Sequence, residues 1–128
     1  MPTVNSFEDL VIWQNAQQLA TVVYSLVDKN PKITRDYSFK DQIKRAVLSV
    51  SNNIAEGFEY NNNNHFIRYL RIAKGSCGEV RNCLLFAVAV GFDSYENLQS
   101  AILQSKILAQ KIGSLINYLT TKRQPATR

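Results

Sequence analysis

The side chains that could carry out catalysis are few and scattered in this sequence. Its single histidine, His65, follows a run of asparagines, and no serine lies near it in the chain to be activated as a nucleophile. Glu56 and Glu79 could approach as a pair of carboxylates, but salt bridges to Arg45 or Arg81 are the simpler interpretation. The sequence also lacks a phosphate-cradling G-x-x-x-x-G-K loop. We therefore expect no enzymatic activity.

Metal binding, disulfide formation and membrane insertion are likewise disfavoured. Cys77 and Cys83 lie six residues apart within one predicted helix, a spacing that cannot form a disulfide without breaking the helix. One histidine and two cysteines are too few for a zinc cluster. Residues 1–9 show no signal-peptide pattern, and the longest apolar run, 84–90, is too short to span a membrane. We expect a cytoplasmic protein with reduced thiols, no metal, no cofactor and no membrane contact.

A strip of amide, hydroxyl and charged side chains follows one flank of the second predicted helix, with two similar residues on the third. At about 100° per residue these side chains stack in one row. The strip comprises Gln42, Arg45, Ser49, Asn52, Asn53 and Glu56, with Ser76 and Glu79 on the next helix. It is either a site for a ligand, RNA or another subunit, or a hydrogen-bonded network that locks the two helices together. The network is favoured, because buried polar groups usually satisfy one another.

Basic side chains on the same two predicted helices could contact phosphate. They are Lys40, Lys44, Arg68, Arg71, Lys74 and Arg81. Arginine suits this role because its planar fork donates two parallel hydrogen bonds. The net charge of +5 is unevenly placed: residues 37–92 hold seven basic and four acidic side chains, whereas residues 1–36 hold three and four. A polyanion-binding surface and an ordinary solvated basic face both fit this pattern.

Apolar and glycine residues outside the predicted core indicate self-association. Gly75 and Gly78 fall on the non-core side of the third predicted helix, where each glycine costs about 1 kcal/mol relative to alanine. Close approach of another helix would explain them. Trp13, Tyr24 and Leu48 also lean outward from their helices. Helices with apolar side chains on two sides predict an interface between copies of the chain.

The elements that must position these residues are helices. The chain of 128 residues is 45% hydrophobic, and its five glycines and three prolines are too few for the many turns of a β-sandwich or barrel. Apolar residues recur at spacings of three and four, and short links make successive helices antiparallel. We predict an all-α single domain, an up-down-up-down four-helix bundle. The helices are expected at about 6–28, 38–57, 64–90 and 94–122, with a flexible tail at 123–128.

Punctuation residues set the expected helix ends. Ser6, followed by Asp9, resembles an N-cap. Gly57 is expected to end the second helix, because glycine tolerates a left-handed backbone. Asn63 or Asn64 is expected to cap the third. The four consecutive asparagines are thus interpreted as a turn rather than as a binding motif.

Several short segments together resemble a known family, the four-helix-bundle proteins encoded in intervening sequences of bacterial large-subunit (23S) ribosomal RNA. They are Trp13-Gln14 with Ala16 and Tyr24, Gln42 to Ala46, Ser49 to Gly57, Phe66 to Leu70, and Ala73, Gly75-Ser76 and Glu79. The similarity extends from about Phe7 to Leu119, and the Asn-Ile-Ala-Glu-Gly element at 53–57 is its most specific part.

This resemblance implies a homopentameric ring with no established catalytic activity. It also implies kinship with the accessory proteins of diversity-generating retroelements, which are basic pentamers that bind nucleic acid and a reverse transcriptase. Two departures matter. Ser51-Asn52 stands where the family often has Pro-Ser, which predicts a straighter helix, and Glu59 with asparagines replaces a basic loop, which removes positive charge.

The first hypothesis for function is therefore a homo-oligomeric, pentameric, non-enzymatic accessory protein that binds RNA or DNA through a basic surface. The alternative is a protein-interaction scaffold, such as a polymerase- or toxin-associated adaptor, that does not bind nucleic acid. A small-molecule site in the polar strip is a third interpretation.

Overall fold

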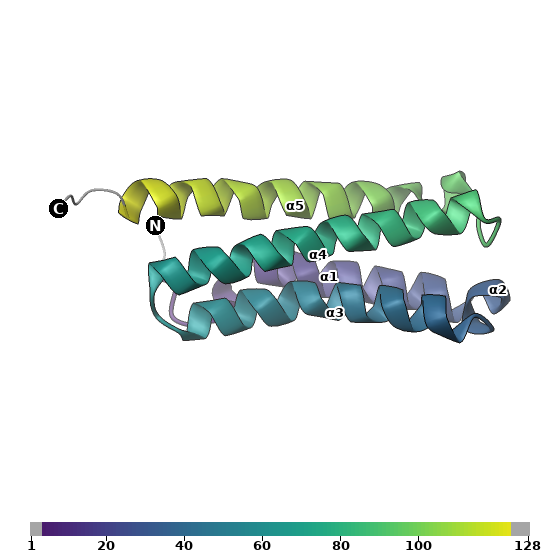
Figure 1. Ribbon diagram of the computed structural model, residues 1–128, viewed down its shortest axis with the longest axis horizontal. Helices are drawn as coiled ribbons and strands as arrows, with labels where there is room; N and C mark the ends of the chain where they lie inside the picture. Colours follow the sequence, from purple (N-terminus) through teal and green to yellow (C-terminus); the bar gives the residue numbers. More distant parts are fainter. Residues whose placement is uncertain (1–3, 124–128) are drawn as a thin grey trace.

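The computed structural model describes residues 4–123. All regular secondary structure in this part of the chain is helical. The elements are a 3-10 turn at Phe7–Asp9, α1 (Val11–Asp28), α2 (Pro31–Thr34), α3 (Tyr37–Glu59), α4 (Asn63–Ala89) and α5 (Tyr95–Arg123). Figure 1 shows the four long helices lying side by side and alternating in direction. Both α1 and α4 contact α3 and α5, so α1 and α4 occupy opposite corners. The predicted all-α up-down-up-down bundle is confirmed.

The core forms where apolar residues recur at helical spacing. In α4 the buried side chains follow an alternating four–three rhythm, as in a coiled-coil seam. They include Phe66, Leu70, Ala73, Cys77, Val80, Leu84 and Ala87. The stripe of α1 is equally regular, at Ile12, Ala16, Leu19, Val23 and Val27. No helix within residues 4–123 has an apolar stretch long enough to cross a lipid bilayer.

The first expected helix is shorter than predicted, and the link after it is more ordered. The Asp9 carboxylate accepts from the backbone N–H of Ser6 (3.3 Å), but it closes only a 3-10 turn before Leu10 becomes extended. Farther along, Asn30 accepts from the backbone N–H groups of Lys32 and Ile33, and this cap starts the one-turn helix α2. Ile33 of α2 is buried, which fixes the link to the core.

The turn between α3 and α4 also differs from the prediction. The helix α3 continues two residues past Gly57, to Glu59. Asn61 adopts the left-handed backbone conformation (φ 52°) that Gly57 was expected to supply, and asparagine tolerates this conformation better than most residues. The cap of α4 is Asn62, which accepts from the backbone N–H of His65, rather than Asn63 or Asn64. At the other end, α5 includes Arg123, which was predicted to begin the tail, and the rest of the expected tail, 124–128, lies outside the described residues.

Gly57 has a different role, because it lies where α3 packs tightly against α4. A Cβ atom at this position would lie 2.6 Å from Cβ of Tyr69 and 3.3 Å from Cδ1 of Phe66. Real Cβ atoms do not approach so closely, so only glycine lets Tyr69 pack against α3 in this way. The end of the Asn-Ile-Ala-Glu-Gly element is therefore a packing position.

We expect Gly57→Ala to lower the free energy of unfolding by about 1–3 kcal/mol, because the added methyl group overpacks the α3–α4 contact. Chemical denaturation followed by circular dichroism measures this change. Gly78→Ala is the matched control, since nothing lies within 4 Å of a Cβ atom added there. It should raise the stability by up to about 1 kcal/mol through helix propensity alone. Equal stability of the two variants would contradict the packing role of Gly57.

Candidate nucleic-acid interface

Half of the residues in the polar strip form hydrogen bonds between α3 and α4. The Gln42 amide donates to the Glu79 carboxylate (2.6 Å), and the Ser49 and Ser76 hydroxyls share a hydrogen bond of 2.8 Å. Asn53 Nδ2 donates to the carbonyl oxygen (2.8 Å) and to Oγ (2.9 Å) of Ser49. These bonds use polar groups that a ligand would otherwise contact, and the Gln42–Glu79 and Ser49–Ser76 bonds join α3 to α4.

Three members of the strip lie outside this network, and one of them, Asn52, is exposed. Arg45 is exposed and donates to Asp41 on its own helix (2.8 Å). Glu56 is also exposed and lies near Tyr69, whose pKa its charge helps to raise. The strip is therefore not one continuous site.

The structure does not gather the six predicted phosphate-binding residues into one patch. Lys44 Nζ forms an ion pair with Asp28 of α1 (2.8 Å) and lies 4.4 Å from the centre of the Tyr24 ring. Lys40 Nζ lies 5.0 Å from the centre of the Tyr37 ring, at the end of α3 where that helix begins. Lys44 therefore serves the α1–α3 contact, and Lys40 lies toward the opposite end of the bundle from Arg68.

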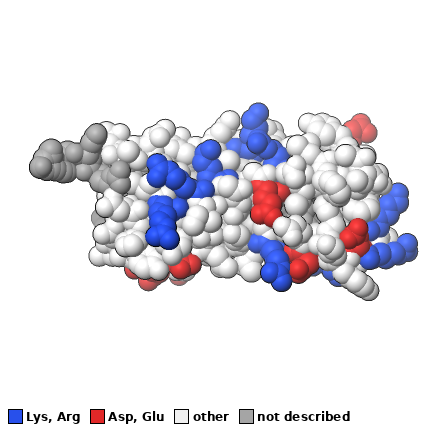
Figure 2. Space-filling model, viewed as in Figure 1, with Lys and Arg blue, Asp and Glu red and all other residues white. Residues whose placement is uncertain are grey.

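Arg68, Arg71 and Lys74 form a basic band across the outward surface of the first half of α4. Their spacing of three residues rotates each one by about 60° from the last, so the band crosses the helix from the α3 side toward α5. All three are exposed, and the ion pairs found within residues 4–123 involve none of them. Arg81, farther along α4, is half-buried. In Figure 2, the Lys and Arg side chains (blue) form separate groups on this face. In the right-hand half of the view, Asp and Glu side chains (red) lie among these groups.

The α5 side of the basic band opens into a groove between α4 and α5. This groove, of about 620 Å³, is lined by Arg71, Lys74, Gly75, Gly113, Ile116 and Asn117. Gly75 therefore belongs to the basic groove, where the absence of a side chain leaves its floor open. An added Cβ atom at Gly75 would meet nothing within 4 Å.

A cluster of stacked aromatic rings lies beside the basic band, at the α3–α4 turn. The Tyr60 ring stacks on the His65 ring (centroids 4.8 Å apart) and on the Tyr69 ring (5.3 Å apart). The guanidinium carbon of Arg68 lies 5.9 Å from the centre of the Tyr69 ring. Tyr60 is 48% exposed. The sequence did not predict this stack, because Tyr60 lies at the end of α3 and its two partners lie on α4.

A hydrogen bond joins the two tyrosines of the stack. The hydroxyl groups of Tyr60 and Tyr69 lie 3.3 Å apart. This hydrogen bond, together with desolvation and the nearby Glu56 carboxylate, raises the pKa of Tyr69 to about 12. The ring therefore stays neutral at physiological pH.

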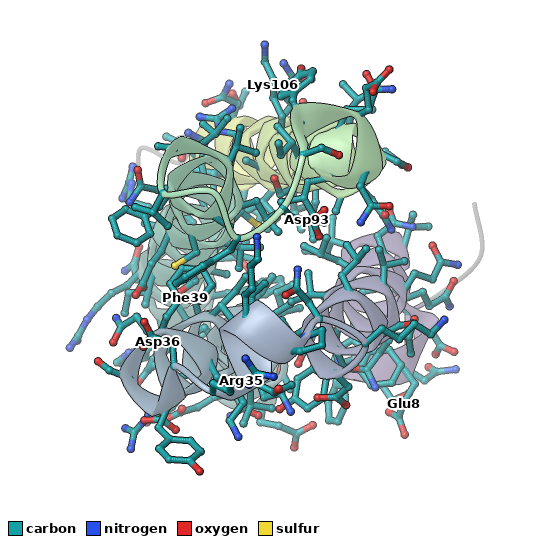
Figure 3. The ribbon with its side chains drawn as sticks, turned by 90° about the vertical axis from the view of Figure 1, so that its right-hand side faces the viewer. Glu8, Arg35, Asp36, Phe39, Asp93 and Lys106 are labelled. Atoms are coloured by element: carbon teal, nitrogen blue, oxygen red, sulfur yellow. The ribbon has the colours of Figure 1, made fainter. Side chains whose placement is uncertain are left out.

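A second group of cations, absent from the sequence prediction, surrounds a pocket of about 590 Å³ at the opposite end of the bundle. Lys29, Lys32 and Arg35 line it together with Asp93. The Asp93 carboxylate accepts hydrogen bonds from the Asn30 and Asn97 side-chain amides, which are neutral donors. Figure 3 looks onto this end, with Asp93 at the α4–α5 turn and Arg35 on the side of α2 and α3.

The predicted interface residues lie on different faces. Tyr24 and Leu48 line one apolar groove between α1 and α3, of about 330 Å³, and Leu48 is 52% exposed. Trp13 is half-buried and packs against the Phe7 ring, with centroids 5.5 Å apart. Gly78 lies on α4, away from this groove.

The two cysteines are buried and free. Burial raises the pKa of Cys77 to about 12 and raises that of Cys83 as well. Both thiols are therefore protonated at neutral pH, and neither is poised as a nucleophile. Within residues 4–123, no group of three or more His, Cys, Asp or Glu side chains could hold a metal ion.

Comparison with known proteins identifies the family. The chain is similar in fold to a crystal structure of a protein with unknown function from the S23 ribosomal protein family of Bacteroides thetaiotaomicron, with a TM-score of 0.76 and 21% identity over 83% of this chain and 98% of that one. No curated protein matches the sequence. A family model described as 23S rRNA-intervening sequence protein matches residues 8–114. The resemblance noted from the sequence is thereby confirmed, and the chain belongs to the 23S rRNA-intervening sequence protein family.

Proposed function

We propose that this chain is a non-enzymatic accessory protein that assembles into a homo-oligomer, a pentameric ring, and binds RNA or DNA through α4. The basic band of Arg68, Arg71 and Lys74 is the observation that carries the proposal. Its three cations are exposed, and carboxylates within residues 4–123 neutralise none of them. Kinship with the nucleic-acid-binding accessory proteins of diversity-generating retroelements is part of the same proposal.

The basic band suits a phosphate backbone better than a single small anion. Its residues follow one another across the helix surface, so they present charge along a line rather than at a point. Each phosphate that a cation neutralises releases condensed counterions, which favours binding. Three contacts per subunit are modest, but a ring repeats them, and linked sites gain avidity without any new contact.

The groove between α1 and α3 supports the assembly part of the proposal. Tyr24 and Leu48 leave an apolar surface there, and a second copy covering it would remove that surface from water. A closed ring joins two different surfaces of each subunit. The α1–α3 groove would supply one of them, away from the basic band on α4.

Salt titration tests the nucleic-acid part. For three phosphate contacts, affinity should fall about 20- to 40-fold between about 50 and 200 mM salt, and more steeply if several subunits engage one strand. Fluorescence anisotropy with a labelled oligonucleotide measures this dependence, and light scattering measures the mass of the free protein. Binding that is unchanged across this salt range would contradict the proposed role of the basic band, and a stable single subunit would contradict the ring.

The alternative function is a protein-interaction scaffold, favoured by the same apolar groove. An amphipathic partner helix could lie between α1 and α3, with its apolar face against Tyr24 and Leu48. A partner that stays bound after nuclease treatment, and that Leu48→Asp releases, would support this alternative.

A further inference from the structure

We propose that the stacked rings of Tyr60, His65 and Tyr69 hold an unpaired base, so that the ligand is a single-stranded or looped-out nucleic-acid segment rather than a continuous duplex. This inference rests on the proposed function and names its substrate class. It starts from the position of the stack, which lies on the surface at one end of the basic band.

The ring geometry suits stacking with a base. The Tyr60 ring is inclined by 26° to the His65 ring and by 18° to the Tyr69 ring, and both contacts are stacked rather than edge-on. Tyr60 is about half exposed, and His65 is exposed. Bases in a duplex are already stacked and cannot reach such rings, whereas unpaired bases stack on aromatic side chains and on arginine planes.

The basic band continues from the stack in a direction that a strand could follow. Arg68 lies against the Tyr69 ring, and Arg71 and Lys74 lead from there into the α4–α5 groove. From His65 to Lys74 the helix rises about 13 Å, at about 1.5 Å per residue. An unpaired strand that crosses this length would bring a few of its phosphates near the cations of the basic band.

The asparagine turn adds groups that can read a base edge. Asn61 and Asn63 line a pocket of about 300 Å³ whose other walls include Phe58, Phe66 and Leu115. Both side chains are exposed, and the hydrogen bonds described within residues 4–123 occupy neither of their amide groups. An amide group offers both a donor and an acceptor, as recognition of a base edge requires. The asparagines thus have a second use beyond forming the turn.

Tyr60→Ala provides the test, because this residue is half exposed and its removal leaves the core intact. Anisotropy is measured with a labelled 12-nucleotide single strand and with a duplex of the same length, each at one fixed salt concentration. We expect Tyr60→Ala to weaken single-strand binding about 5- to 100-fold and to change duplex binding less than about twofold. Tyr60→Phe keeps the ring and should retain single-strand binding.

Tyr37→Ala is the matched control. Tyr37 is also exposed, but it lies at the opposite end of α3 and has no aromatic partner among the ring pairs of residues 4–123. Equal losses for single strand and duplex in Tyr60→Ala, or no loss in either, would overturn this inference while leaving the proposed function standing. A wild-type protein that binds neither ligand would overturn both.

Discussion

Replacing Arg68 and Arg71 together by glutamate is expected to weaken nucleic-acid binding by about 100-fold or more. Hydrogen bonds to a charged group are worth about 1.5–3 kcal/mol each, and the double variant removes two such donors and adds two repelling charges. Neither arginine supports the fold, since both are exposed and neither takes part in an ion pair within residues 4–123. The loss should therefore appear in affinity and leave the unfolding midpoint nearly unchanged. Anisotropy at about 100 mM salt, beside a thermal melt, measures both quantities.

The pocket at the α2 end supplies a charge-matched control for this prediction. Lys29→Glu combined with Arg35→Glu changes the net charge by the same amount, at the opposite end of the molecule. If only the overall field attracted the ligand, both double variants would lose affinity equally. A distinctly smaller loss in the control identifies the basic band as the binding surface. Comparable losses would mean that α4 has no special role.

The long helices could be predicted from the sequence because their apolar residues recur at short, regular spacings. The spacing of Leu70, Ala73, Cys77 and Val80 is visible within about three turns, and all four proved to be buried. The end of α3 was harder to predict. Glycine often ends a helix, yet Gly57 is required by its contact with Tyr69, which lies twelve positions later and on another helix. A local rule cannot weigh such a contact.

The candidate site shows the same division between local and distant effects. The helical spacing of Arg68, Arg71 and Lys74 follows directly from the sequence, and so does their position on one surface. That Lys44 is held by Asp28 depends on how α1 and α3 pack, and no spacing along one helix predicts it. The stack of Tyr60 with Tyr69 likewise requires the α3–α4 turn to be in place. Pairing across helices therefore decides which charges and rings remain available.

Substituting Leu48 by aspartate is expected to convert the assembled protein into single subunits, with a fall in mass to that of one 14.5 kDa chain. Within one subunit the change should be tolerated, because Leu48 is 52% exposed. At a covered interface the aspartate would be buried without a partner, at a cost of several kcal/mol for each subunit contact. Light scattering measures the mass, and circular dichroism checks the helices.

Leu103→Asp on α5 is the matched control, since Leu103 is 56% exposed and lies outside the α1–α3 groove. Its mass should equal that of the wild type. An unchanged mass for Leu48→Asp would show that the groove takes no part in the assembly.

The dissociated variant Leu48→Asp also connects the two parts of the proposal, because its basic band is intact. If the subunits of the ring bind one long strand together, the affinity of a single subunit for that strand should be lower than that of the ring by about 10²-fold or more. A short strand, which reaches only one subunit, should bind equally well to both. If the ring and the single subunit had equal affinity for the long strand as well as for the short one, each subunit would bind independently.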